Sequence, residues 1–228
     1  MTLEVRLLTD GERAAASAVA ARALRDDPMF VYLHGDDPVA RMGATYSSFR
    51  EVPPPAPRSR WQRLVGSGPA PGRAPAPMVG RPTVWGALVQ GHVIGGAAAA
   101  APDACFVDVL PAAIRRMPTG PEGDPGSPDR QARVLATLWA HHCEDRHWHV
   151  GPVGVEPGLQ GRGVGAAVMT LLCDAMDEAG EIAFLETETP ENVVFYRRLG
   201  FEVVSQAELP GLPLWFMRRD PRGRPPHS

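Results

Sequence analysis

The sequence predicts an α/β (α+β) fold in which helices cover a mixed central sheet. Two observations lead to this prediction. In the C-terminal part of the chain, short apolar strands alternate with amphipathic helices, and only short links separate them. In the N-terminal half, two apolar runs flank the dipeptide Gln90-Gly91, which is typical of a β-hairpin. A chain of 228 residues can bury a sound core, and we expect a single domain over residues 1–218.

The first part of the chain is expected to form a strand and two helices. Residues 3–8 alternate enough for a strand, and Thr9 with Glu12 forms a capping-box pattern before an alanine-rich helix. We expect Pro28 to end this helix. Asp37, which precedes a proline, predicts the start of a second helix.

Two segments rich in proline and glycine interrupt the middle of the chain. We expect residues 53–82 to form a loop insertion without regular structure, and residues 118–129 to form a second loop. The hairpin lies between them, with strands at 84–89 and 92–100. Residues 131–144 follow and place their apolar side chains on one face, which predicts a helix.

The C-terminal part supplies the alternation on which the fold prediction depends. The expected elements are a strand at 148–155, a helix at 164–178, a strand at 182–186, a helix at 191–199, and closing strands at 201–204 and 214–217. Arginine, proline and glycine dominate the last residues, so we expect a disordered tail at 219–228.

Composition excludes some classes of function. The formal net charge of −3 gives no reason to expect nucleic acid or a membrane surface as a partner. All 23 basic residues are arginine, which excludes a lysine nucleophile within the chain. Three cysteines without framework spacing predict free thiols, and no apolar signal segment is visible, so we expect a cytoplasmic protein.

The most informative segment is a glycine-rich turn between a short strand and a helix. Val153 to Val155 reads as the end of the strand, Pro157 stops it, and glycines recur at positions 161, 163 and 165. Missing side chains at the start of a helix leave backbone N–H groups uncovered at the positive end of the helix dipole. The turn therefore predicts a binding site for an anion, and a phosphate group suits it.

Several interpretations of this turn compete. A Walker-type phosphate loop is excluded because the required lysine is absent from the chain. A dinucleotide-binding fingerprint fits Gly161, Gly163 and Ala166, with Glu186 at the end of a later strand, and would make the protein an NAD(P)-dependent oxidoreductase. Against that fingerprint, residues 156–160 separate the strand from the first glycine. A glycine-rich connector without a ligand is the third interpretation.

A resemblance to a known family favours another ligand. Gln160-x-x-Gly163-x-Gly165, and downstream Asn192 with Tyr196 before a Gly-Phe pair, resemble two successive motifs of the GNAT superfamily of N-acetyltransferases. The resemblance covers about residues 130–218. It implies a mostly antiparallel central sheet, flanked by helices and splayed at the strand that binds acyl-CoA.

The resemblance also implies roles for individual residues. The diphosphate of acetyl-CoA would lie on the turn, with charge added by Arg162, and the pantetheine arm would run along the preceding strand. Tyr196 would protonate the departing thiolate as the general acid. The expected cofactor-binding residues are Val153, Val155, Gln160, Gly161, Arg162, Gly163, Val164, Gly165, Ala166 and Asn192.

The remaining site residues are less clearly marked. Glu186 is the preferred catalytic base, Glu188 is second, and His149 could relay a proton through water. Phe30 and Tyr32 are candidates for the substrate-binding pocket, although aromatic residues at such positions are more often part of the core.

A cluster of histidines invites a metal site. His141, His142, Cys143, His147 and His149 are close in sequence, but adjacent residues on a helix point in different directions and the spacing matches no standard zinc pattern. We therefore expect no metal ion.

Together these observations predict an enzyme that transfers the acetyl group of acetyl-CoA to a primary amine by direct attack in a ternary complex. The acceptor would be a small-molecule or peptide amine, and its identity stays open. The resemblance leaves a homodimer open. It also leaves open a non-catalytic protein that binds coenzyme A as a sensor.

Overall fold

A computed structural model describes residues 2–49, 82–102, 104–108, 110, 112–116 and 128–223. Nearly all of the expected loop insertion at 53–82, most of the second loop at 118–129 and the end of the tail at 219–228 lie outside the described residues. Among the described residues, no helix combines the length and the apolar composition that crossing a bilayer requires.

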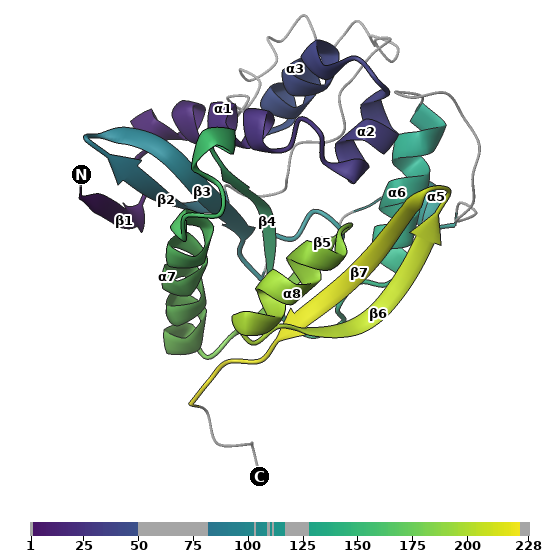
Figure 1. The fold of residues 1–228 in the computed structure, drawn as a ribbon. Helices are drawn as coiled ribbons and strands as arrows, with labels where there is room; N and C mark the ends of the chain where they lie inside the picture. Colours follow the sequence, from purple (N-terminus) through teal and green to yellow (C-terminus); the bar gives the residue numbers. More distant parts are fainter. Residues whose placement is uncertain are drawn as a thin grey trace, which may run out of the picture.

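The strands and the expected helices follow one another in the expected order, and the structure adds two short helices, α2 and α5, that were not expected (Figure 1). The strands are β1 (Leu3–Leu7), β2 (Thr83–Val89), β3 (His92–Ala100), β4 (His147–Val155), β5 (Ile182–Thr187), β6 (Glu202–Leu209) and β7 (Leu212–Arg219). The helices are α1 (Arg13–Ala23), α2 (Pro28–His34), α3 (Pro38–Phe49), α5 (Ala112–Arg115), α6 (Pro128–Ala140), α7 (Val164–Ala179) and α8 (Pro190–Arg198). Single 3-10 turns precede α1 and follow β4.

The strands form one seven-stranded sheet in the order β1-β2-β3-β4-β5-β7-β6. Every neighbouring pair is antiparallel except β4 and β5, which are parallel. The expected mixed, mostly antiparallel sheet is confirmed. A doubly wound dinucleotide-binding fold needs a largely parallel sheet, so the fold of the oxidoreductase alternative is wrong.

The parallel pair opens partway along its length. Register pairs join β4 and β5 from His147 opposite Ile182 to His149 opposite Phe184. β4 then continues to Val155, paired with β3. β5 continues to Thr187, paired with β7. The two strands therefore separate beyond His149, which confirms the predicted splay at the strand expected to bind acyl-CoA.

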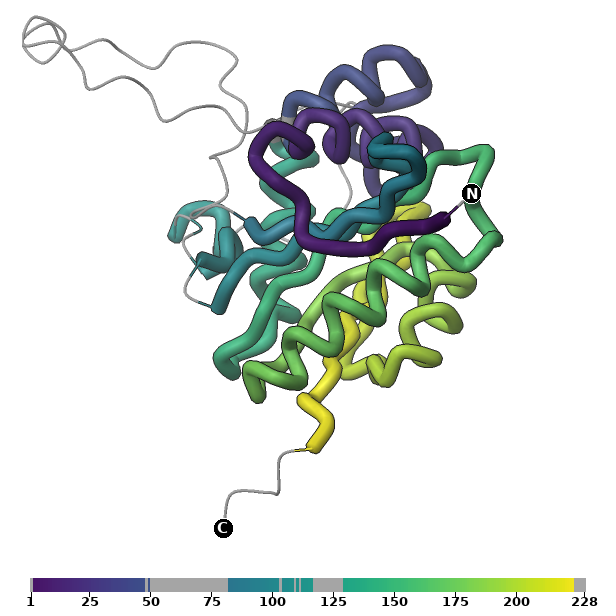
Figure 2. The backbone as a smooth tube through the Cα atoms, turned by 90° about the vertical axis from the view of Figure 1, so that its left-hand side faces the viewer, coloured from purple at the N-terminus to yellow at the C-terminus, as the bar shows by residue number. Residues whose placement is uncertain are grey.

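Two apolar clusters fill the two faces of the sheet. On one face, α7 and α8 pack on the sheet around Met169, Leu172 and Leu185, which are 0 to 1% exposed. The other face carries a cluster with residues of α2 and α6, centred on Phe184 and Phe216. Figure 2 shows α7 in green along the opposite side of the sheet from α1 and α3. The splay between β4 and β5 thus lies between two helical layers.

Pro28 does not end the N-terminal helix as expected but begins α2. Asp27 caps this helix, because its Oδ1 accepts a hydrogen bond from the N–H of Met29 at 3.0 Å. Proline at the first helical position loses no hydrogen bond, since that N–H has no acceptor within the helix. The same Asp-Pro signal that correctly predicted α3 therefore applied here as well.

Other boundaries differ at the ends of elements. α6 begins at Pro128 and ends at Ala140, so His141 and His142 lie beyond its last turn. β6 and β7 are longer than expected and form a hairpin around Gly211, whose φ is 70°. β7 includes Arg219, the first residue of the expected tail, which is 2% exposed.

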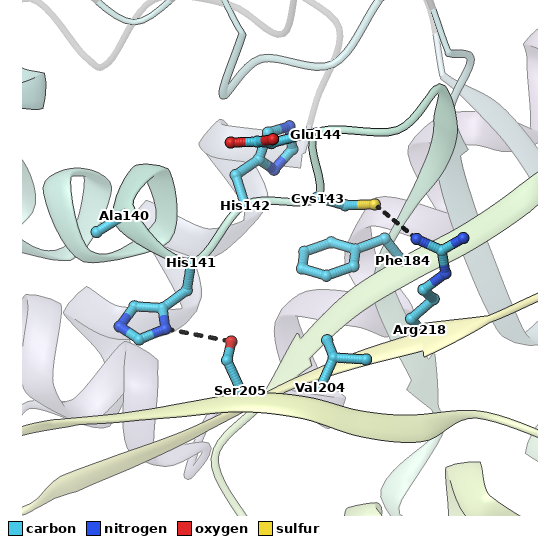
Figure 3. A pocket seen from close by; sticks show the side chains of 9 residues that line it. All are labelled: Ala140, His141, His142, Cys143, Glu144, Phe184, Val204, Ser205 and Arg218. Carbon is cyan, nitrogen blue, oxygen red and sulfur yellow. Dashed lines mark hydrogen bonds between the residues drawn. The ribbon is translucent and has the colours of Figure 1, made fainter.

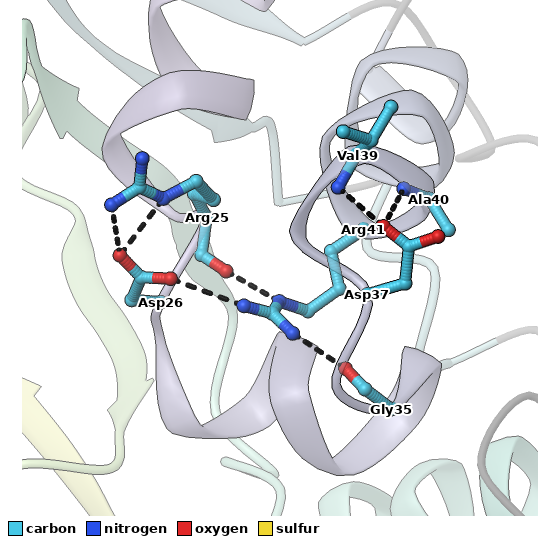
Figure 4. Close-up of polar contacts among 7 residues, drawn as sticks. All are labelled: Arg25, Asp26, Gly35, Asp37, Val39, Ala40 and Arg41. Carbon is cyan, nitrogen blue, oxygen red and sulfur yellow. Dashed lines mark hydrogen bonds and ion pairs between the residues drawn. The ribbon is translucent and has the colours of Figure 1, made fainter.

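A buried arginine holds the three N-terminal helices together (Figure 4). The guanidinium of Arg41, on α3, donates to the carbonyl oxygens of Arg25 and Gly35, both at 2.6 Å. It also contacts Oδ1 of Asp26 at 3.1 Å. These contacts fix the segment between α1 and α2, and with it the position of Asp27.

Candidate functional site

The glycine turn adopts the backbone conformation that its sequence predicts. Gly161 and Gly163 have φ values of 72° and 84°, in the left-handed region that favours glycine. A Cβ atom added at either position would meet no atom within 4 Å. Both glycines are exposed. They are therefore required for the path of the backbone, and the space outside the turn is open.

This turn leaves backbone amides available at the N-terminus of α7. Gly163 is the N-cap residue and has no side chain to cap the helix. The N–H of Ala167 donates to the carbonyl of Gly163 at 3.0 Å as the first bond of the helix. The amides of residues 164–166 therefore have no acceptor within the helix. Together with the helix dipole, they form a site suited to an anion.

Neighbouring residues hold the turn in place. Gln160 donates from Nε2 to the carbonyl of Val155 at 3.2 Å, so its side chain connects the turn to the end of β4. Val164 anchors the helix start in the core and is 7% exposed. The side chains of Arg162 and Ala166 are exposed, and Gly165 approaches Phe195 on α8. Exposed Arg162 therefore offers a positive charge next to the free amides.

The strand that leads into the turn has one edge in the splay. Val153 and Val155 pair with Ala97 and Gly95 of β3, and their side chains pack against the core beneath α7. On the other face, a Cβ atom at Gly154 would lie 3.0 Å from Cβ of Ala23, on α1. Glycine at this position therefore lets α1 lie directly on the strand.

Tyr196 lies on α8, beside the splay. Its ring packs edge-on against Phe195 and Phe201, and the residue is 8% exposed. Burial raises the pKa of the Tyr196 phenol, and the negative charges of Glu188, Glu186 and Asp27 raise it further. The hydroxyl therefore stays protonated at neutral pH and can donate a hydrogen bond or a proton.

Asn192 lies one turn before Tyr196 on α8 and is partly exposed. Its backbone N–H donates to Oγ1 of Thr189, the N-cap residue, at 3.3 Å. Residues four apart share one face of a helix, so Asn192 and Tyr196 lie on the same side of α8.

Three carboxylates influence one another at this end of β5. Burial raises the pKa of Glu188 well above its ordinary value, and the charges of Asp27 and Glu186 raise it further. Burial also raises the pKa of Asp27, to about 6, against hydrogen bonds from the backbone of α2. Because Asp27 lies far from the motifs in sequence, sequence reasoning missed it. We call Asp27, Glu186 and Glu188 the acidic cluster.

Glu186 differs from the other two carboxylates because it has a cationic partner. Its Oε2 lies 2.9 Å from Nε2 of His149, whose side chain is 5% exposed. Burial alone would raise the pKa of Glu186, but the charge and the hydrogen bond of His149 lower it. Glu186 stays a predicted base, although its low proton affinity makes it weaker in that role than Glu188.

The expected pocket aromatics lie on α2 and pack in the second core. Tyr32 is 9% exposed, and the guanidinium of Arg130 lies 4.4 Å from the centre of its ring. Phe30 contacts the rings of His34 and Phe49 at 6.2 and 6.0 Å between centres. These contacts favour a structural role for both, and a role in substrate binding stays a prediction.

Three of the histidines converge, contrary to the divergence expected from the sequence. His142, His147, His149 and Cys105 each bring one ligand atom into a group in which all four atoms lie within 4.8 Å. His142 lies beyond the end of α6, and the other two histidines are two residues apart on β4, so they share one face. Cys105, from the segment after β3, was not part of the expected cluster.

His141 and Cys143, the other two residues of the group that is close in sequence, point elsewhere (Figure 3). His141 stacks on Phe216 at 4.8 Å and contacts the hydroxyl of Ser205 at 3.2 Å. The sulfur of Cys143 lies 3.9 Å from the guanidinium of Arg218. Both residues border a cavity of about 330 Å³ that His142 and Phe184 also line.

Comparison with known proteins agrees with this geometry. The sequence matches the Acetyltransferase (GNAT) family over residues 69–201, which is more than half of the chain. The fold is similar to that of a histone acetyltransferase HPA2 and related acetyltransferase from Corynebacterium glutamicum, with 17% identity, full coverage of both chains and a TM-score of 0.59.

Two further structures share the fold. An agmatine N-acetyltransferase is 13% identical, with 96% of this chain and 99% of that chain covered and a TM-score of 0.58. The PaiA N-acetyltransferase of Thermoplasma acidophilum, solved in complex with coenzyme A, is 10% identical over the same shares, with a TM-score of 0.51. The family match, the splayed parallel pair and the open turn before α7 lead to one conclusion: this chain belongs to the GNAT family of acetyltransferases.

Proposed function

We propose that the protein is an N-acetyltransferase that transfers the acetyl group of acetyl-CoA to a cationic primary amine. The observation that carries this proposal is the position of the backbone N–H groups of residues 164–166, which have no acceptor within α7. They lie at the end of β4, the strand whose other edge faces the splay, and Tyr196 and the acidic cluster lie beside that splay.

In this proposal the diphosphate of acetyl-CoA binds the amides of residues 164–166 and the guanidinium of Arg162. The pantetheine arm runs along the free edge of β4, where its amides can pair with the backbone near Val153 and Val155. A backbone N–H near Val153 polarises the thioester carbonyl and stabilises the oxyanion that forms there.

The reaction then needs one proton acceptor and one proton donor. The neutral amine nitrogen attacks the carbonyl carbon, the tetrahedral intermediate collapses, and the carbon–sulfur bond breaks. In its ionised form Glu188 takes the proton that the amine loses, because its raised pKa makes it a stronger proton acceptor than Glu186. Tyr196 gives a proton to the departing thiolate, which its protonated phenol allows.

The acidic cluster also indicates the class of acceptor. Three carboxylates gather where the acceptor would reach the thioester, and His149 compensates only one of them, Glu186. The pKa values of Asp27 and Glu188 are raised instead, so a nearby cation would favour their ionised forms. An amine with a second positive charge, such as a diamine or a guanidino amine, would stabilise them, whereas a monoamine that loses its proton to react would not.

A steady-state assay tests this function. Release of coenzyme A from acetyl-CoA is measured with agmatine, spermidine and a primary monoamine of similar length, which has no second positive charge. We expect turnover with agmatine and spermidine and a kcat/KM at least about tenfold lower with the monoamine. The Glu188→Gln variant should lose about 10²-fold in kcat. Glu191→Gln, at an exposed position on α8, is the matched control and should behave as wild type.

Calorimetry separates the proposal from its alternatives. Heat with acetyl-CoA, none with NAD and turnover with an amine support the enzyme. Heat with acetyl-CoA without turnover on any amine would indicate a non-catalytic sensor that binds coenzyme A. No heat with acetyl-CoA would overturn the proposed binding site.

A further inference from the structure

Four potential metal ligands meet at the point where β4 and β5 separate. Cys105, His142, His147 and His149 each supply one ligand atom, and these atoms all lie within 4.8 Å of one another. Cys105, His147 and His149 are 2 to 4% exposed, and the side chain of His142 is 6% exposed. We call these four residues the Cys-His cluster. A set of one thiol and three imidazoles, closed to solvent on most sides, is chemically suited to zinc.

The distances within the cluster are close to those of a tetrahedral site. Sγ of Cys105 lies 3.6 Å from Nε2 of His142 and 3.3 Å from Nδ1 of His149. Zinc bonds of about 2.0 to 2.3 Å at tetrahedral angles place neighbouring ligand atoms about 3.3 to 3.7 Å apart. Two edges of the tetrahedron are therefore already formed, and small side-chain rotations would close the others.

The outer contacts of two histidines fix which nitrogen faces the cluster. His147 Nδ1 lies 2.7 Å from the carbonyl of Asp145, so it donates there, and its buried Nε2 has no hydrogen-bond partner. His149 Nε2 donates to Glu186, which leaves Nδ1 directed to the sulfur. Metal-binding histidines typically donate their second N–H to a carbonyl or a carboxylate in this way. The unpaired Nε2 of His147 would gain a partner if a metal were bound.

His142 completes the set and connects it with the surface. Its Nε2 also lies 3.1 Å from Oδ1 of Asp108, an exposed side chain whose contact costs little to lose. His142 and Phe184 line the cavity of about 330 Å³, which offers an ion a path to the cluster (Figure 3). Phe184 also packs against the rings of His142, His147 and His149, at 5.4 to 6.0 Å between centres. An apolar wall of this kind strengthens charge interactions within the site.

We propose that Cys105, His142, His147 and His149 bind one zinc ion in a closed, structural site that ties the segment after β3 and the end of α6 to β4. Four protein ligands leave no open position, so the ion stabilises the fold and does not take part in acetyl transfer. Through His149 the site also positions Glu186 in the acidic cluster.

The competing explanation is a metal-free ion pair. Burial raises the pKa of the Cys105 thiol, but hydrogen bonds from the three histidines outweigh it and lower the pKa to about 4. A thiolate beside an imidazolium would also hold these side chains together. The two explanations differ in one measurable respect, because only the first predicts a bound metal.

The test measures metal content and ligand identity in the full-length protein, produced with a tag that contains no histidine. Elemental analysis of protein from zinc-supplemented cells should give close to one zinc ion per chain. After removal of zinc by a chelator, titration with Co²⁺ should produce the visible bands of a tetrahedral site and a near-ultraviolet thiolate-to-cobalt band. Zinc should raise the melting temperature of the chelated protein.

Variants identify the ligands. Cys105→Ser should abolish the thiolate-to-cobalt band, and His147→Asn should lower the zinc content well below one. Cys143→Ser is the matched control, since its sulfur contacts Arg218, and it should keep both signals. A zinc content near zero together with no cobalt bands in the wild type would overturn the proposal in favour of the ion pair. Survival of the thiolate band in Cys105→Ser would overturn it as well. If a variant fails to fold, the wild-type titration still decides.

Discussion

Replacing Gly163 with aspartate tests the anion site directly. The new carboxylate would sit at the N-cap of α7, next to the amides that we assign to the diphosphate of acetyl-CoA. Two like charges about 4 Å apart repel by about 1 kcal/mol in water and about 4 kcal/mol at an effective dielectric constant of 20. Since the turn is exposed, we take about 2 kcal/mol, which is about a 30-fold rise in the Kd for acetyl-CoA.

The same substitution should leave the fold intact. A φ of 84° costs a side chain roughly 1 kcal/mol, and less for aspartate than for most residues. A carboxylate at a helix N-terminus contributes about 0.3 to 1 kcal/mol in the opposite direction. A Cβ atom at position 163 meets nothing within 4 Å, so no clash adds to this balance. The melting temperature should therefore change by no more than about 3 °C.

Isothermal titration calorimetry with acetyl-CoA measures the Kd, and thermal denaturation measures the stability. Gly211→Asp is the matched control, because Gly211 is exposed, has a φ of 70° and also has no atom within 4 Å of an added Cβ. It lies in the β6–β7 turn, far from α7 in Figure 1. An unchanged Kd in Gly163→Asp, at normal stability, would refute the assignment of the diphosphate to this turn.

Three further predictions concern the proposed general acid Tyr196, Asp27 of the acidic cluster, and the buried Arg41 that joins the N-terminal helices. Tyr196→Phe keeps the ring packing and should lower kcat about 10²-fold with an unchanged Kd for acetyl-CoA; wild-type turnover would exclude the acid role. Burial raises the folded-state pKa of Asp27 to about 6, so its contribution to stability is present at low pH and is lost as pH rises from about 4 to 6. Asp27→Asn keeps an N-cap acceptor and should remove this part of the pH dependence of the melting temperature, and a slope equal to that of the wild type would contradict the shift. Arg41→Met leaves the carbonyls of Arg25 and Gly35 without their donor and should cost about 3 kcal/mol, or about 9 °C in melting temperature, whereas exposed Arg25→Met should cost little.

The elements that the sequence predicted well are those that local rules determine. The glycine turn and α7 follow from the backbone freedom of glycine and from helical periodicity, which involve only neighbouring residues. The same holds for α8, where Thr189 caps the helix and accepts a hydrogen bond from the N–H of Asn192. The start of α2 was missed although its Asp27-Pro28 signal is equally local, because proline was taken only as a helix breaker.

The parts that could not be predicted depend on contacts between distant segments. Cys105 and His142 are 37 positions apart and meet only because β3 and β4 are neighbours in the sheet. The coupling of Asp27 with Glu188 requires α2 to lie over the end of β5, and no periodicity in either segment indicates this. Burial, which raises the pKa of both carboxylates, is likewise a property of the assembled fold.

The proposed zinc site and the proposed acceptor site are linked by a charge balance at Glu186. A zinc ion with one thiolate and three neutral imidazoles has a net charge of +1, whereas a thiolate–imidazolium pair is neutral overall. Without the metal, the single positive charge of His149 faces both the thiolate of Cys105 and the carboxylate of Glu186, so a zinc site would compensate Glu186 more fully. With Glu186 compensated, the carboxyl groups left to interact with an acceptor are those of Asp27 and Glu188. The preference for a cationic amine and the integrity of the Cys-His cluster should thus depend on each other, although no ligand of the metal touches the acetyl group.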